Sequence, residues 1–187
     1  MKKDQKRAMA FGTHPDDIEI GCGGTVALLA RRGFGITHVV LTSGEAGSDR
    51  VPPWEMGPAR EKEALEAAKV LGSAGVEFLR YPDGLTGFTR EMKVDIIRLV
   101  RRLRPHVVFV HERNETSLGH RVASELVLES LQAGSGPWFQ EAGGEPWSPE
   151  LILGYEVWHP LGRWELAVDI SETLETKIRA LACHRSQ

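Results

Sequence analysis

A histidine and two aspartates stand close together near the start of the chain, in a Thr-His-Pro-Asp-Asp segment that follows an apolar stretch. The proline stiffens this turn, and the spacing lets His14 and Asp17 bind one metal ion with Asp16 beside them as a base. The alternative is a polar turn in which Asp16 or Asp17 caps the next helix and His14 is merely exposed. The segment is therefore a candidate metal site with an adjacent proton acceptor.

A catalytic zinc commonly has three protein ligands and one open position, so a third ligand must come from another part of the chain. His120 follows a later apolar run and is the best candidate, and His111, at the end of that run, is its rival. His38 and His106 lie at or before the starts of predicted strands, which places them at the opposite edge of a parallel sheet. We expect structural roles for those two.

A second polar loop, 43–48, follows a β-branched run and places Glu45 at the same edge of the predicted sheet. Its glycines also suit a phosphate-binding loop, but it lacks both Gly-x-Gly-x-x-Gly and a Walker lysine. A nucleotide site is further disfavoured because the first turn carries carboxylates where a phosphate would bind. The loop is therefore expected to border the same crevice without binding a nucleotide.

These side chains need a scaffold, and apolar runs alternate with helical patterns along most of the chain. Strands are predicted at 8–12, 36–42, 76–81 and 106–111, and helices at 26–32, 59–71, 91–103 and 121–132. A long loop over 133–149 precedes two further predicted strands, 151–158 and 165–170, and a last helix that begins with a capping arrangement at Ser171 and runs through Cys183. The pattern predicts one α/β domain over 1–187 with a mostly parallel sheet and a site at the carboxyl ends of its strands.

The composition is that of a soluble globular domain, with 187 residues, 41% hydrophobic and 26% charged residues. A net charge of −3 gives no basic field for nucleic acid. No apolar stretch reaches the roughly 20 residues that a membrane span needs, and no signal peptide is visible. Together with only two cysteines, Cys22 and Cys183, this predicts a cytoplasmic protein with reduced thiols.

Several short motifs occur in a fixed order along nearly the whole chain. They are His14-Pro-Asp-Asp with Glu19, Gly23-Gly24-Thr25, Leu41-Thr-Ser-Gly-Glu-Ala-Gly47, Arg60-x-x-Glu63, Asp83-Gly84, Gly119-His120-Arg121 and His184-Arg-Ser-Gln187. In this set and order the chain resembles the LmbE-like, PIG-L deacetylase family. The resemblance implies a Rossmann-like three-layer fold, zinc or another divalent metal, and removal of an N-acetyl group from an N-acetylglucosamine-type sugar conjugate by a zinc-activated water.

The resemblance also implies roles for individual residues. The metal ligands carry over to His14, Asp17 and His120, and the general base to Asp16. His184 is expected to assist in stabilising the oxyanion, and Glu45 and Arg60 match positions near the substrate. For Arg60, a solvated helix face shared with Glu63 is the competing interpretation.

The chain departs from the family where members usually have His-x-Asp-His, because Ser117 and Gly119 precede His120. A lost oxyanion donor costs about 100 to 1,000-fold in rate, so a non-catalytic or impaired metal- and sugar-binding protein is the alternative function. His111, Arg113, Glu115 or His184 are candidates to compensate. The family also commonly continues beyond His-x-Ser-Gln, so a shortened C-terminal end is a second expectation.

Aromatic side chains gather toward the end of the chain. They are Trp138, Phe139, Trp147, Trp158 and Trp164. Such residues stack on sugars or pack in cores and subunit interfaces, which leaves a homo-oligomer as an open expectation.

Overall fold

Five parallel strands form one sheet in the order β3-β2-β1-β4-β5 in the computed structural model, which describes residues 5–84 and 87–187. The strands are β1 Arg7–Gly12, β2 Gly35–Thr42, β3 Gly75–Tyr81, β4 Val107–His111 and β5 Leu151–Tyr155. The order reverses between β1 and β4, and ligands bind at such a point in open α/β sheets. The predicted α/β class is confirmed.

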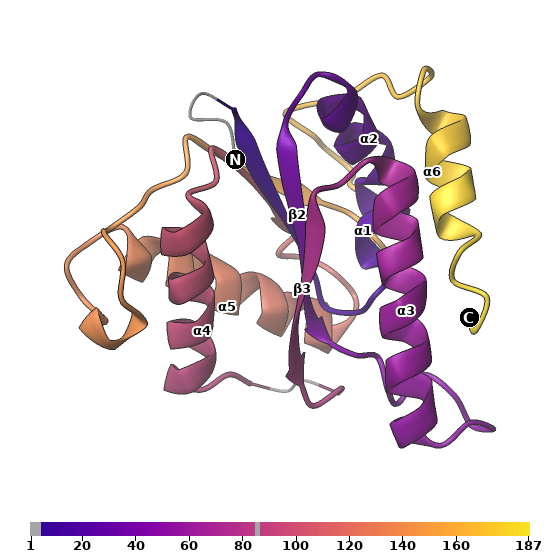
Figure 1. Ribbon diagram of the computed structural model, residues 1–187, viewed down its shortest axis with the longest axis horizontal. Helices are drawn as coiled ribbons and strands as arrows, with labels where there is room; N and C mark the ends of the chain where they lie inside the picture. Colours follow the sequence, from indigo (N-terminus) through magenta and orange to yellow (C-terminus); the bar gives the residue numbers. More distant parts are fainter. Residues whose placement is uncertain (1–4, 85–86) are drawn as a thin grey trace.

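Helices cover both faces of the sheet and make three layers (Figure 1). One face carries α1 Asp17–Gly21, α2 Gly23–Arg31, α3 Pro53–Leu71 and α6 Leu174–Leu181, and the other carries α4 Arg90–Leu103 and α5 Leu118–Gly134. A short 3₁₀ helix, η1 Gln140–Ala142, lies in the long loop before β5. The helix positions agree with the sequence expectation to within a few residues for α2, α4 and α5.

The alternation of side chains along β1 explains why both faces are covered. Met9 and Phe11 belong to the core beneath α4 and α5, while Ala8 and Ala10 belong to the core beneath α1, α2 and α6. Successive residues of a strand point to opposite faces, so a strand that is apolar throughout must be buried on both. The small alanines let the short α1 lie close to the sheet.

Three local expectations were wrong. Residues 165–170 form no strand, although Leu166, Val168 and Ile170 alternate with polar residues; they run as an irregular segment that lines a hollow beside β5 and α2. The last helix begins at Leu174, and Thr173 donates its hydroxyl to Gly24 O instead of capping the helix. The turn after β1 contains a helix, α1, that the pattern did not predict.

Among the described residues, no helix combines the length and the apolar character that crossing a membrane requires. The longest, α3, is also strongly charged.

Candidate metal centre

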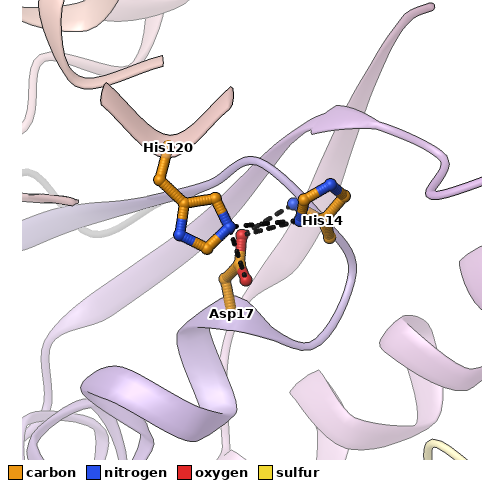
Figure 2. A group of neighbouring side chains, drawn as sticks. All are labelled: His14, Asp17 and His120. Carbon is orange, nitrogen blue, oxygen red and sulfur yellow. Dashed lines mark hydrogen bonds and ion pairs between the residues drawn. The ribbon is translucent and has the colours of Figure 1, made fainter. Parts of the chain in front are cut away.

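The loops that leave the carboxyl ends of β1, β3 and β4 bring titratable side chains to one edge of the sheet. His14 and Asp17 follow β1, and His120 lies in the first turn of α5, after β4. Figure 2 shows the three side chains pointing toward one another from separate elements. The structure thus brings together the three residues that the sequence predicts as metal ligands.

The ligand atoms of these three residues are close enough to share one ion. His14 Nδ1 lies 3.3 Å from His120 Nε2, and Asp17 Oδ1 lies 3.5 Å from the same Nε2. Two nitrogens bound tetrahedrally to zinc at about 2.05 Å are separated by roughly 3.3 Å. The spacing of the donor atoms therefore fits a tetrahedral metal ion.

In each of the two histidines, the ring nitrogen that faces away from the cluster contacts a carboxylate. Asp83 Oδ1 lies 3.1 Å from His14 Nε2, and Glu115 Oε2 lies 2.9 Å from His120 Nδ1. A carboxylate accepts, so each ring donates from that nitrogen and presents the lone pair of its other nitrogen to the cluster. Two lone pairs facing each other repel without a cation between them, which is a second reason why this donor set suits a metal.

The charges around His14 act on its proton in opposite directions. Burial lowers its pKa, but hydrogen bonds to Asp17 and Asp83 outweigh burial and raise the pKa to about 10. The same bond with His14 lowers the pKa of Asp83 to about 2. A metal ion bound by His14 would therefore compete with a proton for the same ring.

His111, the rival ligand, instead lies beside Asp17. Its Nε2 accepts the backbone N–H of Thr13 at 3.0 Å and lies 3.2 Å from Asp17 Oδ2, and that oxygen accepts the backbone N–H of His14. Its ring stacks on that of His120, with the centroids 4.1 Å apart. His111, Glu115 and His120 also form a compact group, but Glu115 is engaged by His120 and by two backbone N–H groups.

Asp16, the predicted base, stands at the N-cap of α1, yet its side chain caps nothing. Its Oδ1 instead accepts from Arg60 Nη2 at 3.0 Å. Arg60 is only 4% exposed, and its Nη1 donates to Gly44 O. The alternative of a capping aspartate is therefore not realised, and Arg60 does not lie on a solvated helix face.

Glu45 links two loops at the edge of the site. Its Oε1 accepts the backbone N–H of Asp83 at 2.8 Å, and Asp83 Oδ2 accepts the N–H of Ala46. Glu45 thus fixes the turn whose aspartate orients His14.

His184, which was expected to assist at the oxyanion, lies in the core beside Glu19 and not in the cluster of ligand atoms. Its Nε2 is 3.6 Å from Glu19 Oε2, and the other oxygen of Glu19 is 3.7 Å from His38 Nδ1. His38 is in the middle of β2, not at its start, and its Nε2 lies 2.9 Å from Ser73 Oγ. Helix α6 packs against α1 and α3. His184, which follows α6, therefore lies next to Glu19 of α1.

The sequence did not single out two carboxylates that complete this site. Asp83 lies in the turn after β3, as a motif residue without an assigned role, and Glu115 is one of four candidates to compensate for Ser117 and Gly119. Glu115 is buried and its carboxylate orients His120. It thus supplies a carboxylate beside His120, although Gly119 stands where family members usually have an aspartate. Their position after predicted strands was the available signal, but spacing alone does not pair a carboxylate with a ring.

Comparison with known proteins connects this arrangement to deacetylases. The chain is 31% identical to the diacetylchitobiose deacetylase of Thermococcus kodakarensis over 98% of its own length and 71% of that protein. A solved structure of the N,N'-diacetylchitobiose deacetylase of Pyrococcus horikoshii superposes with a TM-score of 0.89 at 30% identity, covering 99% of this chain and 72% of the other.

A third relative has a different activity. The 4-oxalmesaconate hydratase of Pseudomonas putida is 28% identical over the full length of this chain and 76% of its own. The model of one protein family, described as PIG-L, GlcNAc-PI de-N-acetylase, matches residues 9–131, which include every residue of the cluster. By this match and by its similarity to the archaeal deacetylases, the chain belongs to the PIG-L family.

Proposed function

We propose that the protein is a zinc-dependent hydrolase that removes the N-acetyl group from an N-acetylglucosamine-type sugar. The observation that carries the proposal is the pair of histidine nitrogens, 3.3 Å apart, on rings that are each held by a carboxylate, beside Asp17 and the proposed base Asp16. The family and the relatives that deacetylate diacetylchitobiose support the substrate class.

His14, Asp17 and His120 would hold the metal, with Zn²⁺ favoured by two imidazoles and one carboxylate. A bound zinc polarises an acetyl carbonyl and makes water nucleophilic at neutral pH. Asp83 and Glu115 keep both rings in the tautomer that binding needs.

Asp16 moves the proton. Its Oδ1 is engaged by Arg60, and among the described residues none donates to its Oδ2, so this oxygen is open to a water molecule. Asp16 takes the proton of the attacking water as the water oxygen bonds to the acetyl carbon. It then gives that proton to the nitrogen as the C–N bond breaks, leaving acetate and a free amine.

Ser117 and Gly119 favour the alternative, a metal- and sugar-binding protein with little or no turnover. Neither side chain supplies the imidazole that family members usually place here, and Ser117 stands at the N-cap of α5. The hydratase relative supports a second catalytic possibility, addition of water to an unsaturated carboxylate.

The test measures acetate release from N-acetylglucosamine and N,N'-diacetylchitobiose by purified protein of known metal content, with and without a chelator. We expect release that the chelator abolishes and zinc restores, and an Asp16→Asn variant that keeps its metal but loses turnover. Metal without release from either sugar would favour the binding protein, while conversion of 4-oxalmesaconate would favour the hydratase. Full activity of Asp16→Asn would refute the assignment of the base.

A further inference from the structure

The segment after α6 binds two helices, and three consecutive side chains of this segment each meet a different glutamate. The pairs are His184 with Glu19 of α1, Arg185 with Glu66 of α3 and Ser186 with Glu63 of α3. Figure 1 shows α6 and this segment beside α3. The side chain of Arg185 is 72% exposed, whereas those of His184 and Glu19 are 2% and 0% exposed. The pair of His184 and Glu19 is therefore the deeply buried attachment of this segment.

We propose that His184 is a positioning residue, which holds α1 through Glu19 and thereby fixes the metal ligand Asp17 on the other side of that helix. This inference rests on the metal ligands of the proposed function but not on its reaction, so it applies equally to a protein that binds metal without turnover. A metal ligand must be held within about 0.5 Å of its productive position, which gives the supports of α1 an influence on metal affinity.

Helix α1 directs its two carboxylates to opposite sides. Asp17 and Glu19 are two residues apart in a helix of five residues, which separates their directions by about 200°. Asp17 Oδ1 lies 3.5 Å from His120 Nε2. Glu19 points instead toward His38 and His184. Because both carboxylates are buried, α1 is held on two sides, and a shift of α1 on the side of Glu19 moves Asp17 relative to His120.

Glu19 depends on two histidines for its compensation. Among residues 5–84 and 87–187, neither of its oxygens accepts a hydrogen bond, and no lysine or arginine nitrogen lies within 4.0 Å of them. Oε1 is 3.7 Å from His38 Nδ1, and Oε2 is 3.6 Å from His184 Nε2. A buried carboxylate that loses its compensating group is strongly destabilising. The position of Glu19 is therefore sensitive to the loss of either ring.

The positive charge beside Glu19 comes from His184 and not from His38. The Nε2 of His38 is 2.9 Å from Ser73 Oγ, and its ring projects from β2, which is paired on both sides. Burial lowers the pKa of His38 and His184 lowers it further, while Glu19 opposes both. His38 is therefore mainly neutral at pH 7, and His184 is the ring that can carry a charge next to Glu19.

The decisive experiment is a double-mutant cycle on zinc affinity with His184→Leu, Glu19→Gln and the double variant, measured by competition with a chromophoric chelator. We expect His184→Leu to weaken zinc binding about tenfold, because it leaves the charge of Glu19 uncompensated. In the Glu19→Gln background the same change should alter the affinity by less than about twofold, since the amide carries no charge. Equal losses in both backgrounds, or wild-type affinity of His184→Leu, would overturn the proposal.

Ser186→Ala supplies the matched control, because it breaks a contact of the same segment with Glu63 and leaves Glu19 untouched. Arg101→Ala is a second control, since Arg101 is 4% exposed and binds backbone carbonyls around 134–143, away from the site. Both should lower stability and leave the zinc affinity of the folded protein unchanged. An equal loss of affinity in either control would make His184 an ordinary stabilising residue. If His184→Leu does not fold, His184→Gln takes its place in the cycle, with a smaller loss expected because its amide still donates.

A measurement on the metal-free protein separates this inference from the proposed function. The backbone N–H of His14 donates to Asp17 Oδ2 at 2.8 Å, so the NMR resonance of this amide reports the position of that carboxylate. His184→Leu should shift the resonance, whereas Ser186→Ala should not. A shift in a protein that binds no zinc would remove the metal ligands of the proposed function and leave His184 as the support of Asp17. An unmoved resonance would overturn the positioning role, whatever the activity.

Discussion

The two carboxylates behind the histidines are expected to set metal affinity. Because Asp83 and Glu115 fix the rings of His14 and His120, we expect Asp83→Asn and Glu115→Gln to weaken zinc binding about 10- to 100-fold. Competition with a chromophoric chelator measures this directly. Glu129→Gln is the control, since Glu129 is an exposed partner of Lys93 and should leave the affinity unchanged. Wild-type affinity in both site variants would show that the rings need no support.

At the level of single residues, the sequence predicts ligands better than it predicts their supports. His14 and Asp17 are three residues apart, so the local turn determines their proximity. Asp83 lies 69 residues from His14, and only the β3-β2-β1 strand order brings the two together. The contacts of Arg60 could not be predicted for the same reason. Its motif indicates that it lies near the site, but the direction of its side chain depends on how α3 packs against the sheet.

At the level of elements, strands with continuous apolar runs were predictable and isolated alternating segments were not. β1, β2 and β4 have partners on both sides, so their sequences and their structures agree. Residues 165–170 alternate as a strand would, yet Ile170 packs against Gly24 of α2. Alternation fits any half-buried extended segment, and a strand forms only where a sheet edge accepts its hydrogen bonds.

The buried histidine of β2 predicts a pH-dependent stability. Burial lowers the pKa of His38 from its ordinary 6.5, Glu19 opposes this and His184 adds to it. The unfolded chain then binds a proton more readily than the folded protein, so the free energy of unfolding should decrease as pH falls below about 6.5.

Urea unfolding between pH 5 and pH 8 tests this effect, because an ordinary histidine changes its charge within that pH range. His38→Gln should flatten the slope, because the glutamine does not titrate. His106→Gln, which changes a histidine outside this buried group whose Nδ1 accepts the N–H of Arg7, is the comparison variant. Equal slopes in all three proteins would mean that His38 does not contribute.

At the scale of the whole molecule, the strand at the far edge of the sheet reaches the site through a chain of contacts. Tyr155, at the end of β5, donates its hydroxyl to Phe11 O, and its ring lies 4.9 Å from that of His111. Glu115, which orients His120, also accepts the N–H groups of Trp158 and His159 just beyond β5. The edge strand and its following segment therefore help to hold the ligands in place.

Gly21 is where this edge meets the turn that carries the ligands. A Cβ there would overlap the ring of Tyr155 and lie 2.7 Å from Glu156 O, so Gly21→Ala must push β5 away from α1. We expect a loss of about 1–3 kcal/mol in the free energy of unfolding, together with weaker zinc binding. Gly75→Ala has open space and should stay within about 0.5 kcal/mol of wild type. Loss of stability with undiminished zinc affinity would show that the site is held by β1, β3 and β4 alone, whereas loss of both would make the edge strand part of the metal centre's support.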